Sequence, residues 1–402
     1  MLNEAAVPAG RRTRIAIILG APPSAQNLDR IGARQLGRFF DVKVLDCTRV
    51  VGRIWEEALA DRTISVESVT DIAEFREWMA CSRPDYAIDF IGWTKYTPAI
   101  FRILRDLNIR IVIQSLAAKP SGAAAARGMR LLLHNPLRVT KAVVSRVVKQ
   151  QAVRTISADV ALLAGLRSVT AESRRAQTII WTGSRDYHEY RRTPRDPTVA
   201  KGTEFIVFLD EAMVNSSDYR LVGLRQPVAT EDYYSLLNGC FTRLEEMTGM
   251  TIVVAAHPNG KSDVNYPSYF GNRMVRFDST AALCAASNLV LLHASTAASY
   301  AVLWRRPTLV LTSVALDRSW QRDAIRSMGH ELKCPTLFMD AADGAYRSAL
   351  ARCARPDLEA YERYRRNYLV TDDVRESEPW QSFINYVQGS AASIEAAAAA
   401  RG

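Results

Sequence analysis

Three short polar clusters follow three apolar stretches in the second half of the chain. They are Asp210-Glu211 after EFIVFL, His257-Pro258 after TIVVAA, and Ser295-Thr296 shortly after NLVLL. Carboxylates and imidazoles exchange protons, and hydroxyls at a helix start hold phosphate groups. If the apolar stretches are strands of one parallel sheet, their carboxyl ends share an edge, which is where such folds bind ligands. The clusters are therefore predicted to form one site.

The acidic pair supplies a candidate general base. Adjacent side chains of an extended strand point to opposite sides, so only one of Asp210 and Glu211 can face the site. A carboxylate in that position can take the proton from an attacking hydroxyl group. Both residues remain candidates at this point, and a solvated loop acid is the alternative interpretation of each.

The other two clusters are typical of a phosphate site. A helix is expected to begin at Ser295-Thr296, where hydroxyls, free backbone N–H groups and the helix dipole favour an anion. His257 is one of five histidines in the chain, and its charge can change near neutral pH. We assign six residues to nucleotide binding: His257, Pro258, Lys261, His293, Ser295 and Thr296. A plain helix cap and structural histidines are the alternative interpretations.

Several well-known motifs are absent from the sequence. No GxxxxGK[ST] or GxSxG segment occurs, and no GxGxxG follows a strand. This disfavours P-loop enzymes, α/β-hydrolases and nicotinamide or flavin enzymes. Asp-x-Asp pairs are also absent and histidines are few, so we predict no metal site and no cofactor. Histidine, lysine, hydroxyls and helix dipoles would then neutralise a leaving phosphate.

Hydrophobic periodicity predicts alternating strands and helices in both halves, as in parallel sheets covered by helices. Apolar runs indicate strands at 14–19, 42–46, 87–92, 109–114, 204–209, 251–256, 288–292 and 308–312. Helical spacing of apolar residues indicates helices at 97–107, 231–247, 279–286, 296–304, 316–328, 344–353 and 356–368. The alternation breaks between about 117 and 200.

The fold class is therefore α/β, with two Rossmann-like domains facing a cleft. We assign the N-terminal domain to 1–195 and the nucleotide-binding domain to 203–370, joined by a Pro-rich, charged linker within 191–203. Residues 371–389 are expected to pack back on the N-terminal domain. Residues 390–402 are expected to be a disordered, alanine-rich tail.

The formal net charge is +10, and much of the excess lies in the segment 119–157, which has eight Lys or Arg and no acid. Valines spaced as on one side of a helix predict a basic amphipathic helix there, suited to an anionic membrane surface. An ordinary helix with a solvated basic face is the alternative. The segment lacks aromatic residues, which disfavours nucleic acid as a partner. With no apolar span or secretory signal, we expect a cytoplasmic protein, peripheral on the inner membrane.

The second half resembles bacterial sialyltransferases, polysialyltransferases and Kdo transferases of the GT-B fold, which build capsule and lipopolysaccharide. These families carry an acidic D/E-D/E-G motif, an HP motif and a Ser-Ser or Ser-Thr motif, in that order. The matching stretches here are FLDEA (208–212), AAHPNG (255–260) and LLHASTAASYAVLWRRP (291–307). SRDYHEY (184–190) and EDYY (231–234) are similar to segments of other surface-polysaccharide glycosyltransferases. One departure is Ala212, where the families have glycine.

The resemblance implies a metal-independent inverting glycosyltransferase. Its donor would be a nucleotide-sugar, such as a CMP-activated nonulosonate or Kdo, and its acceptor a glycan or a lipid-linked glycan. It also implies that Asp186, Tyr187 and His188 lie on the acceptor side. A UDP-sugar 2-epimerase-like enzyme on the same fold and a non-catalytic polyanion- or membrane-binding protein are the two alternatives.

Overall fold

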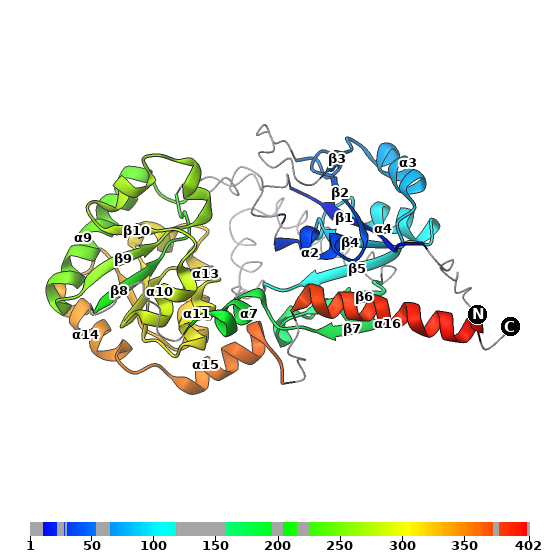
Figure 1. Cartoon of the computed structure of the whole chain (residues 1–402). Coiled ribbons are helices and arrows are strands. Elements are labelled where there is room, and N and C mark those ends of the chain that lie inside the picture. Colours follow the sequence, from blue (N-terminus) through cyan, green and yellow to red (C-terminus); the bar gives the residue numbers. More distant parts are fainter. Residues whose placement is uncertain are drawn as a thin grey trace, which may run out of the picture.

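The computed structural model describes residues 11–21, 28, 30–53, 65–117, 120, 157–194, 204–214, 226–372 and 378–399. These residues form two lobes, each built on one parallel β-sheet with helices packed against it (Figure 1). The first lobe takes the chain as far as helix α7, and the second lobe follows. The predicted α/β class with two Rossmann-like domains is confirmed.

The first sheet has seven parallel strands in the order β3-β2-β1-β4-β5-β6-β7. The strands are β1 (Arg14–Leu19), β2 (Asp41–Asp46), β3 (Val66–Ser68), β4 (Tyr86–Phe90), β5 (Arg110–Ser115), β6 (Val160–Leu163) and β7 (Thr178–Trp181). The helical elements are α2 (Ala33–Gly37), α3 (Ile72–Ser82), α4 (Thr97–Asp106), η1 (Leu166–Ser168), η2 (Ser173–Arg175) and α7 (Arg185–Arg192). Strands such as β1 and β6 are apolar almost throughout, because helices cover both faces of the sheet.

Local sequence explains where the helices of this lobe begin and end, as α3 shows. The Asp71 carboxylate accepts hydrogen bonds from the amides of Ala73 and Glu74 at 2.8 and 3.0 Å. Glu74 in turn accepts the Thr70 amide at 2.7 Å, which completes a reciprocal helix cap. The helix ends at Arg83, whose φ of 43° lies in the left-handed region.

The second sheet has six parallel strands in the order β10-β9-β8-β11-β12-β13. The strands are β8 (Phe205–Leu209), β9 (Thr251–Ala255), β10 (Met274–Arg276), β11 (Leu289–Leu292), β12 (Thr308–Thr312) and β13 (Thr336–Phe338). The α-helices are α9 (Thr230–Thr248), α10 (Thr280–Ala286), α11 (Ala298–Leu303), α12 (Val314–Arg318), α13 (Arg322–Leu332), α14 (Asp343–Cys353) and α15 (Leu358–Tyr364). Short turns of 3-10 helix form η4 (Pro258–Ser262) and η5 (Tyr266–Phe270), and η6 (Arg365–Leu369) is a π-helical turn.

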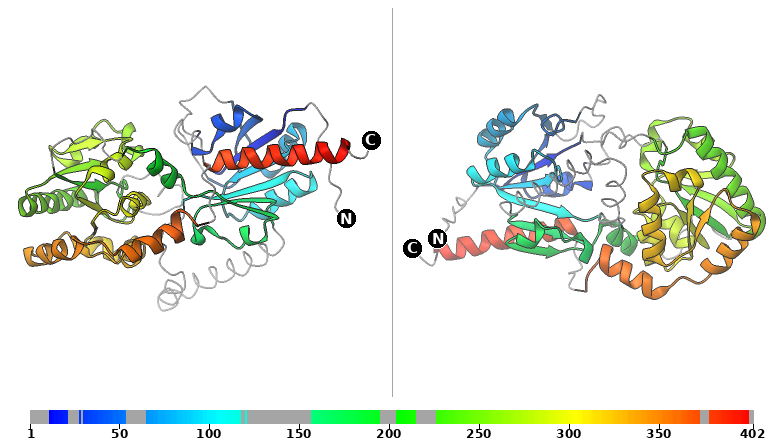
Figure 2. Two further views of the ribbon diagram at one scale, coloured as in Figure 1. Left: turned by 60° about the horizontal axis from the view of Figure 1, so that its bottom comes forward. Right: turned by 180° about the vertical axis from the view of Figure 1, so that it is seen from behind.

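The last helix, α16 (Pro379–Ala399), returns to the first lobe and lies along its sheet (Figure 2). Trp380, Phe383, Ile384 and Val387 are buried at helical spacing, in one cluster with the apolar side chains of β1 and β4. Trp380 packs against Gly32, where an added Cβ would lie 2.5 Å from the indole ring. The helix continues through 390–399, part of the range for which the sequence predicts a disordered tail.

The middle of the chain differs from expectation. The sequence predicts that the alternation of strands and helices breaks between about 117 and 200. Strands β6 and β7 nevertheless continue the first sheet there, and helix α7 follows them. These strands have only four residues each, too short for an apolar run to stand out. Helix α7 extends to Arg192, into the range assigned to the linker. Apart from Pro120 and Ser157, the basic segment 119–157 lies outside the described residues.

Candidate functional site

In each sheet, the first strands in chain order are added on one side of the starting strand, and the later strands are added on its other side. In the second sheet this switch lies between β8 and β11, and in the first between β1 and β4. Ligands of open parallel sheets bind beyond the carboxyl ends of the strands at such switch points. The two switch points are therefore the places to search for a site.

The three predicted clusters do meet at the switch point of the second sheet. Leu209 pairs with Ala255, so Glu211 and His257 follow side by side at the ends of β8 and β9. The Glu211 Oε1 atom accepts hydrogen bonds from the amides of His293 and Ala294, at 3.0 and 2.6 Å, just past the end of β11. The predicted convergence thus follows from the strand register and from these two hydrogen bonds.

Asp210 points into the second lobe and is 5% exposed. Its Oδ2 atom accepts hydrogen bonds from the amides of Ala212 and His257, at 3.1 and 3.3 Å, and from the Tyr266 hydroxyl. Burial raises the pKa of Asp210, and these hydrogen bonds oppose the rise. These contacts hold the carboxylate inside the lobe, and its role as general base stays a prediction. Asp210 ties the ends of β8 and β9 to η5.

Ala212 keeps the tight turn that the glycine of the resembling families suggests. Its φ is 48°, in the left-handed region, and its amide donates to Asp210. An alanine in that region costs about 1–2 kcal/mol relative to the right-handed one. The substitution of glycine by alanine therefore adds strain but leaves the backbone path at the end of β8 intact.

His257 begins the 3-10 turn η4 at the end of β9. Its Nδ1 atom accepts the amide hydrogen of Asn259 at 3.2 Å. A neutral ring that accepts at Nδ1 carries its proton on Nε2, and is a hydrogen-bond donor there. Pro258 supplies the first residue of η4, where its missing N–H costs nothing. Lys261, also assigned to nucleotide binding, forms an exposed ion pair with Asp278.

His293 is a core residue, which corrects its assignment to nucleotide binding. It is 0% exposed, and its ring lies between the Leu311 carbonyl, 2.7 Å from Nδ1, and the Tyr233 hydroxyl, 2.9 Å from Nε2. Burial lowers the pKa of His293 to about 4. The neutral ring therefore donates to Leu311 and accepts from Tyr233, and neither ring nitrogen remains for a ligand.

Replacing His293 with phenylalanine tests this assignment. At pH 7 the variant should be less stable by about 2 kcal/mol, because Tyr233 and Leu311 lose their partner. Only the unfolded wild type takes up a proton between pH 6.5 and 4, so the wild type loses up to about 3 kcal/mol as the pH falls through that window. The difference in the free energy of unfolding between the two proteins should therefore disappear by pH 4.5. Urea unfolding followed by circular dichroism measures it. A difference in the free energy of unfolding that stays the same from pH 7 to pH 4.5 would contradict a buried neutral ring.

Ser295 and Thr296 form the turn before α11, which begins two residues later than predicted, at Ala298. Ser295 is 9% exposed, and its hydroxyl accepts the Ala297 amide at 3.2 Å. Thr296 is exposed. The pairing of β11 with β12 places Ser295 beside Ser313, so two serines and one threonine follow neighbouring strand ends. Of these, Thr296 offers the hydroxyl most accessible to a ligand.

The predicted acceptor residues lie on α7, and one of them, Asp186, contacts the second lobe. The Asp186 carboxylate accepts hydrogen bonds from Ser299 at 2.5 Å and from Tyr300 at 3.5 Å, both on α11. His188 is buried, and its Nε2 atom lies 2.6 Å from the Thr182 carbonyl. Burial raises the pKa of Asp186 and lowers that of His188. Both side chains thus have partners within the protein, and the acceptor role of these two residues and of half-buried Tyr187 stays a prediction.

We call the contact between α7 and α11 the lobe joint. Besides Asp186, it includes Glu189, which accepts the Tyr300 hydroxyl at 2.6 Å, and the rings of Tyr190 and Trp304, 4.6 Å apart. Helix α7 follows the carboxyl end of β7, and α11 follows that of β11. The joint therefore places the carboxyl edges of both sheets on the side where the lobes meet, and α7 lies between the lobes in Figure 1.

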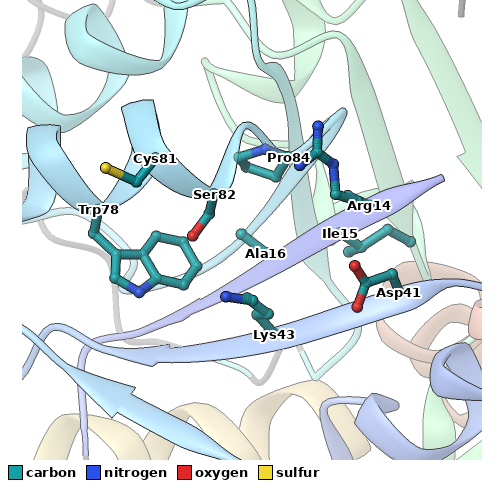
Figure 3. A pocket seen from close by; sticks show the side chains of 9 residues that line it. All are labelled: Arg14, Ile15, Ala16, Asp41, Lys43, Trp78, Cys81, Ser82 and Pro84. Carbon is teal, nitrogen blue, oxygen red and sulfur yellow. The ribbon is translucent and has the colours of Figure 1, made fainter. Parts of the chain in front are cut away.

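A small cavity of about 150 Å³ lies at the opposite, amino edge of the first sheet (Figure 3). It is lined by Arg14, Ile15, Ala16, Asp41, Lys43, Trp78, Cys81, Ser82 and Pro84. Lys43 is already engaged there, by the Trp78 ring and by an ion pair with Glu67. Since this cavity is far from any strand's carboxyl end, it does not compete for the switch-point ligand.

Two features are absent from the described part of the chain. In those ranges no three His, Cys, Asp or Glu side chains are grouped as metal ligands would be. Among the helices described, none combines the length and the apolar character needed to cross a bilayer.

Comparison with known proteins gives similarity of structure only. No known protein-family profile matches the sequence, and no curated protein matches it. Among solved structures, the calicheamicin glycosyltransferase CalG4 is 12% identical, with a TM-score of 0.53 over 94% of this chain and 98% of that one. MurG of Acinetobacter baumannii is 10% identical, with a TM-score of 0.49 over 94% and 100% of the two chains.

The UDP-GlcNAc 2-epimerase of Methanocaldococcus jannaschii is 11% identical, with a TM-score of 0.47 over 94% of this chain and 99% of that one. Of these three structures, CalG4 has a TM-score above 0.5 and the other two do not, and at these identities a likeness concerns the fold alone. Together with the two parallel sheets, it assigns this chain to the GT-B fold.

Proposed function

We propose that the protein is an inverting, metal-independent glycosyltransferase whose nucleotide-sugar donor binds at the carboxyl edge of the second sheet. The observation that supports this most is the meeting of Glu211, His257 and Ser295 at the β8–β11 switch point. That edge lies on the side where the lobes join, so a second substrate on the first lobe can approach it. The GT-B fold is compatible with this arrangement.

Each part of the edge suits one part of a nucleotide-sugar. The His257 ring can donate from Nε2 to a phosphate oxygen, and exposed Thr296 has a hydroxyl in the turn after β11. Because Asp210 accepts the His257 backbone amide, it holds that residue at the end of β9. Hydrogen bonds to the departing phosphate stabilise the charge that develops as the glycosidic bond breaks.

The finer part of the proposal rests on the resemblance of FLDEA, AAHPNG and LLHAST to known motifs. It supports a CMP-activated nonulosonate or Kdo as the donor and a glycan or lipid-linked glycan as the acceptor, in surface-polysaccharide synthesis. Attachment to the inner membrane through 119–157 belongs to the same proposal.

A nucleotide screen by thermal shift tests the proposal. We expect one of CMP, CDP, UDP, GDP or their sugars to raise the melting temperature of the wild type by several degrees, since saturation at 100 times Kd adds about 2.7 kcal/mol. His257→Ala should abolish the shift, and His330→Ala, at an exposed histidine of α13, should keep it. Polyanions or anionic vesicles that bind when no nucleotide does would contradict the proposal. Turnover of a UDP-sugar without any acceptor would point to the epimerase alternative.

A further inference from the structure

A carboxylate that the sequence clusters do not include, Asp89, lies at the switch point of the first sheet. In the register of β1 and β4, Ile18 pairs with Asp89 and Leu19 with Phe90. β2 and β3 extend the sheet beyond β1, whereas β5, β6 and β7 extend it beyond β4. Asp89 is thus one residue from the end of a central strand, at the position where such sheets bind ligands.

The ends of β1 and β4 approach each other closely beside Asp89. Gly20 follows β1, and an added Cβ there would lie 2.9 Å from the Ile91 Cα atom. A glycine is therefore required for the close approach of the two strand ends. The Arg53 guanidinium donates to the Gly20 carbonyl at 2.5 Å, which fixes this turn.

The Asp89 carboxylate is held in place by backbone amides. Its Oδ1 atom accepts the Ile91 amide at 2.8 Å, while the side chain stays half-buried. In the part of the chain that the structure describes, no lysine or arginine forms an ion pair with it. The titratable groups that face it are the buried Cys47 thiol and Glu172. Burial, with a smaller contribution from Glu172, raises the pKa of Asp89 to about 7, and the amide hydrogen bonds oppose the rise.

The two acids of FLDEA do not match this combination. Asp210 is enclosed in the core, and one oxygen of Glu211 already accepts two backbone amides. Asp89 is half-buried, lacks a cationic partner among the described residues, and belongs to the carboxyl edge that adjoins the lobe joint. A group that titrates near neutral pH is the most effective proton acceptor at that pH.

We propose that Asp89 is the general base that deprotonates the acceptor, an inference that rests on the proposed transferase function. In this step the acceptor O–H proton moves to a carboxylate oxygen of Asp89 while the acceptor oxygen forms its bond to the anomeric carbon. The bond from that carbon to the donor phosphate breaks, and its electron pair leaves with the nucleotide. The first lobe thus supplies the base and the second lobe holds the leaving group.

The test compares Asp89→Asn with the wild type, using the nucleotide-sugar that gives the largest thermal shift. Release of free nucleotide is measured with water and with a panel of oligosaccharides as acceptors. We expect kcat to fall by roughly 100- to 1,000-fold, while the thermal shift with the nucleotide stays unchanged. The wild-type kcat should rise with pH through about 7 and level off, and Asp89→Asn should lack that rise. Asp89→Glu, which keeps a carboxylate, should recover part of the activity. Its kcat should again rise with pH, with the rise centred at a different pH.

Asp85→Asn is the matched control, because it makes the same change just before the amino end of β4 and should leave kcat and its pH dependence unchanged. If Asp89→Asn keeps most of the wild-type kcat and the same rise of kcat with pH, Asp89 is not the base, while the proposed function stands. If the wild type binds no nucleotide, or binds a donor that it never consumes, the transferase proposal fails and the inference fails with it.

Discussion

Replacing Asp210 with alanine is expected to lower the free energy of unfolding by about 3–5 kcal/mol, because three donors lose one buried acceptor. The Tyr266 hydroxyl and the amides of Ala212 and His257 all donate to Asp210 Oδ2. Removing the carboxylate also relieves the burial of Oδ1, which has no hydrogen-bond partner in the described part of the chain. Three orphaned donors outweigh that relief. Urea unfolding followed by circular dichroism measures the loss.

Asp210→Asn should cost less, about 1 kcal/mol, because an amide oxygen can replace the accepting atom. Its cost should also depend on pH. Since burial raises the pKa of Asp210, the unfolded chain loses this proton at lower pH than the folded one. Wild-type stability therefore falls as the pH rises above the ordinary carboxyl value near 3.9, and asparagine cannot ionise. The difference in the free energy of unfolding between the wild type and Asp210→Asn should therefore become smaller between pH 4.5 and pH 8.

Asp278→Ala provides the control, since Asp278 is an exposed acid paired only with exposed Lys261 among the ion pairs described. It should change the free energy of unfolding by less than about 1 kcal/mol. A stable Asp210→Ala protein that binds nucleotide but has lost all turnover would show instead that Asp210 faces the substrate. That result would assign the role of general base to FLDEA and remove it from Asp89.

Strands of five or six residues that are buried on both faces could be predicted from the sequence. Strands β1, β8 and β12 are runs of five or six mostly apolar residues bounded by polar ones, a pattern that helices rarely show. Strands β3, β10 and β13 have three residues each and are partly exposed, so neither length nor burial marks them. Their place in the sheet is decided by packing with distant segments, which no local pattern records.

The meeting of the three clusters was predictable for a related reason. Parallel strands share one carboxyl edge, so polar residues that follow adjacent strands must come together. Which side chain points outward was not predictable. Both Asp210 and His293 follow apolar strands as Glu211 and His257 do, yet the core encloses the first two, because aromatic residues from α9 and η5 offer them hydroxyl partners. Tyr233 and Tyr266 lie 60 and 56 residues from those partners, a separation beyond any short motif.

Asp89 illustrates the opposite case. Nothing in AIDFIG marks its acid as special, since a single carboxylate in an apolar strand is equally consistent with a strand end in solvent. Its importance appears only with the strand order, because the switch between β1 and β4 depends on where β2 and β5 pair. The segment SRDYHEY shows the same limit. Its side chains look suited to a substrate, but Asp186 and His188 are occupied by partners from α11 and from the end of β7.

Replacing Tyr300 with alanine is the second change for which we expect a large effect, a loss of about 3–5 kcal/mol in the free energy of unfolding. Tyr300 is 5% exposed on α11, and its hydroxyl donates to Glu189 of α7 at 2.6 Å. Tyr300→Phe keeps the ring and should lose only about 1–2 kcal/mol, mainly from the unpaired Glu189 carboxylate. Because this hydrogen bond crosses the lobe joint, its loss should also loosen α7 locally. Amide exchange of 185–192, followed by mass spectrometry, should accelerate roughly tenfold, since 1.4 kcal/mol corresponds to a factor of ten.

Tyr346→Phe separates that local effect from a general loss of stability. Tyr346 is 0% exposed, and its hydroxyl donates to the Met339 carbonyl at 2.7 Å, so the same substitution removes one buried hydrogen bond within the second lobe. It should cost a similar free energy but leave exchange in α7 unchanged. Equal acceleration of α7 in both variants would mean that the helix opens only with the whole molecule. A selective effect in Tyr300→Phe would mean instead that one tyrosine hydroxyl limits how freely the edge carrying Asp89 can move toward the edge carrying His257.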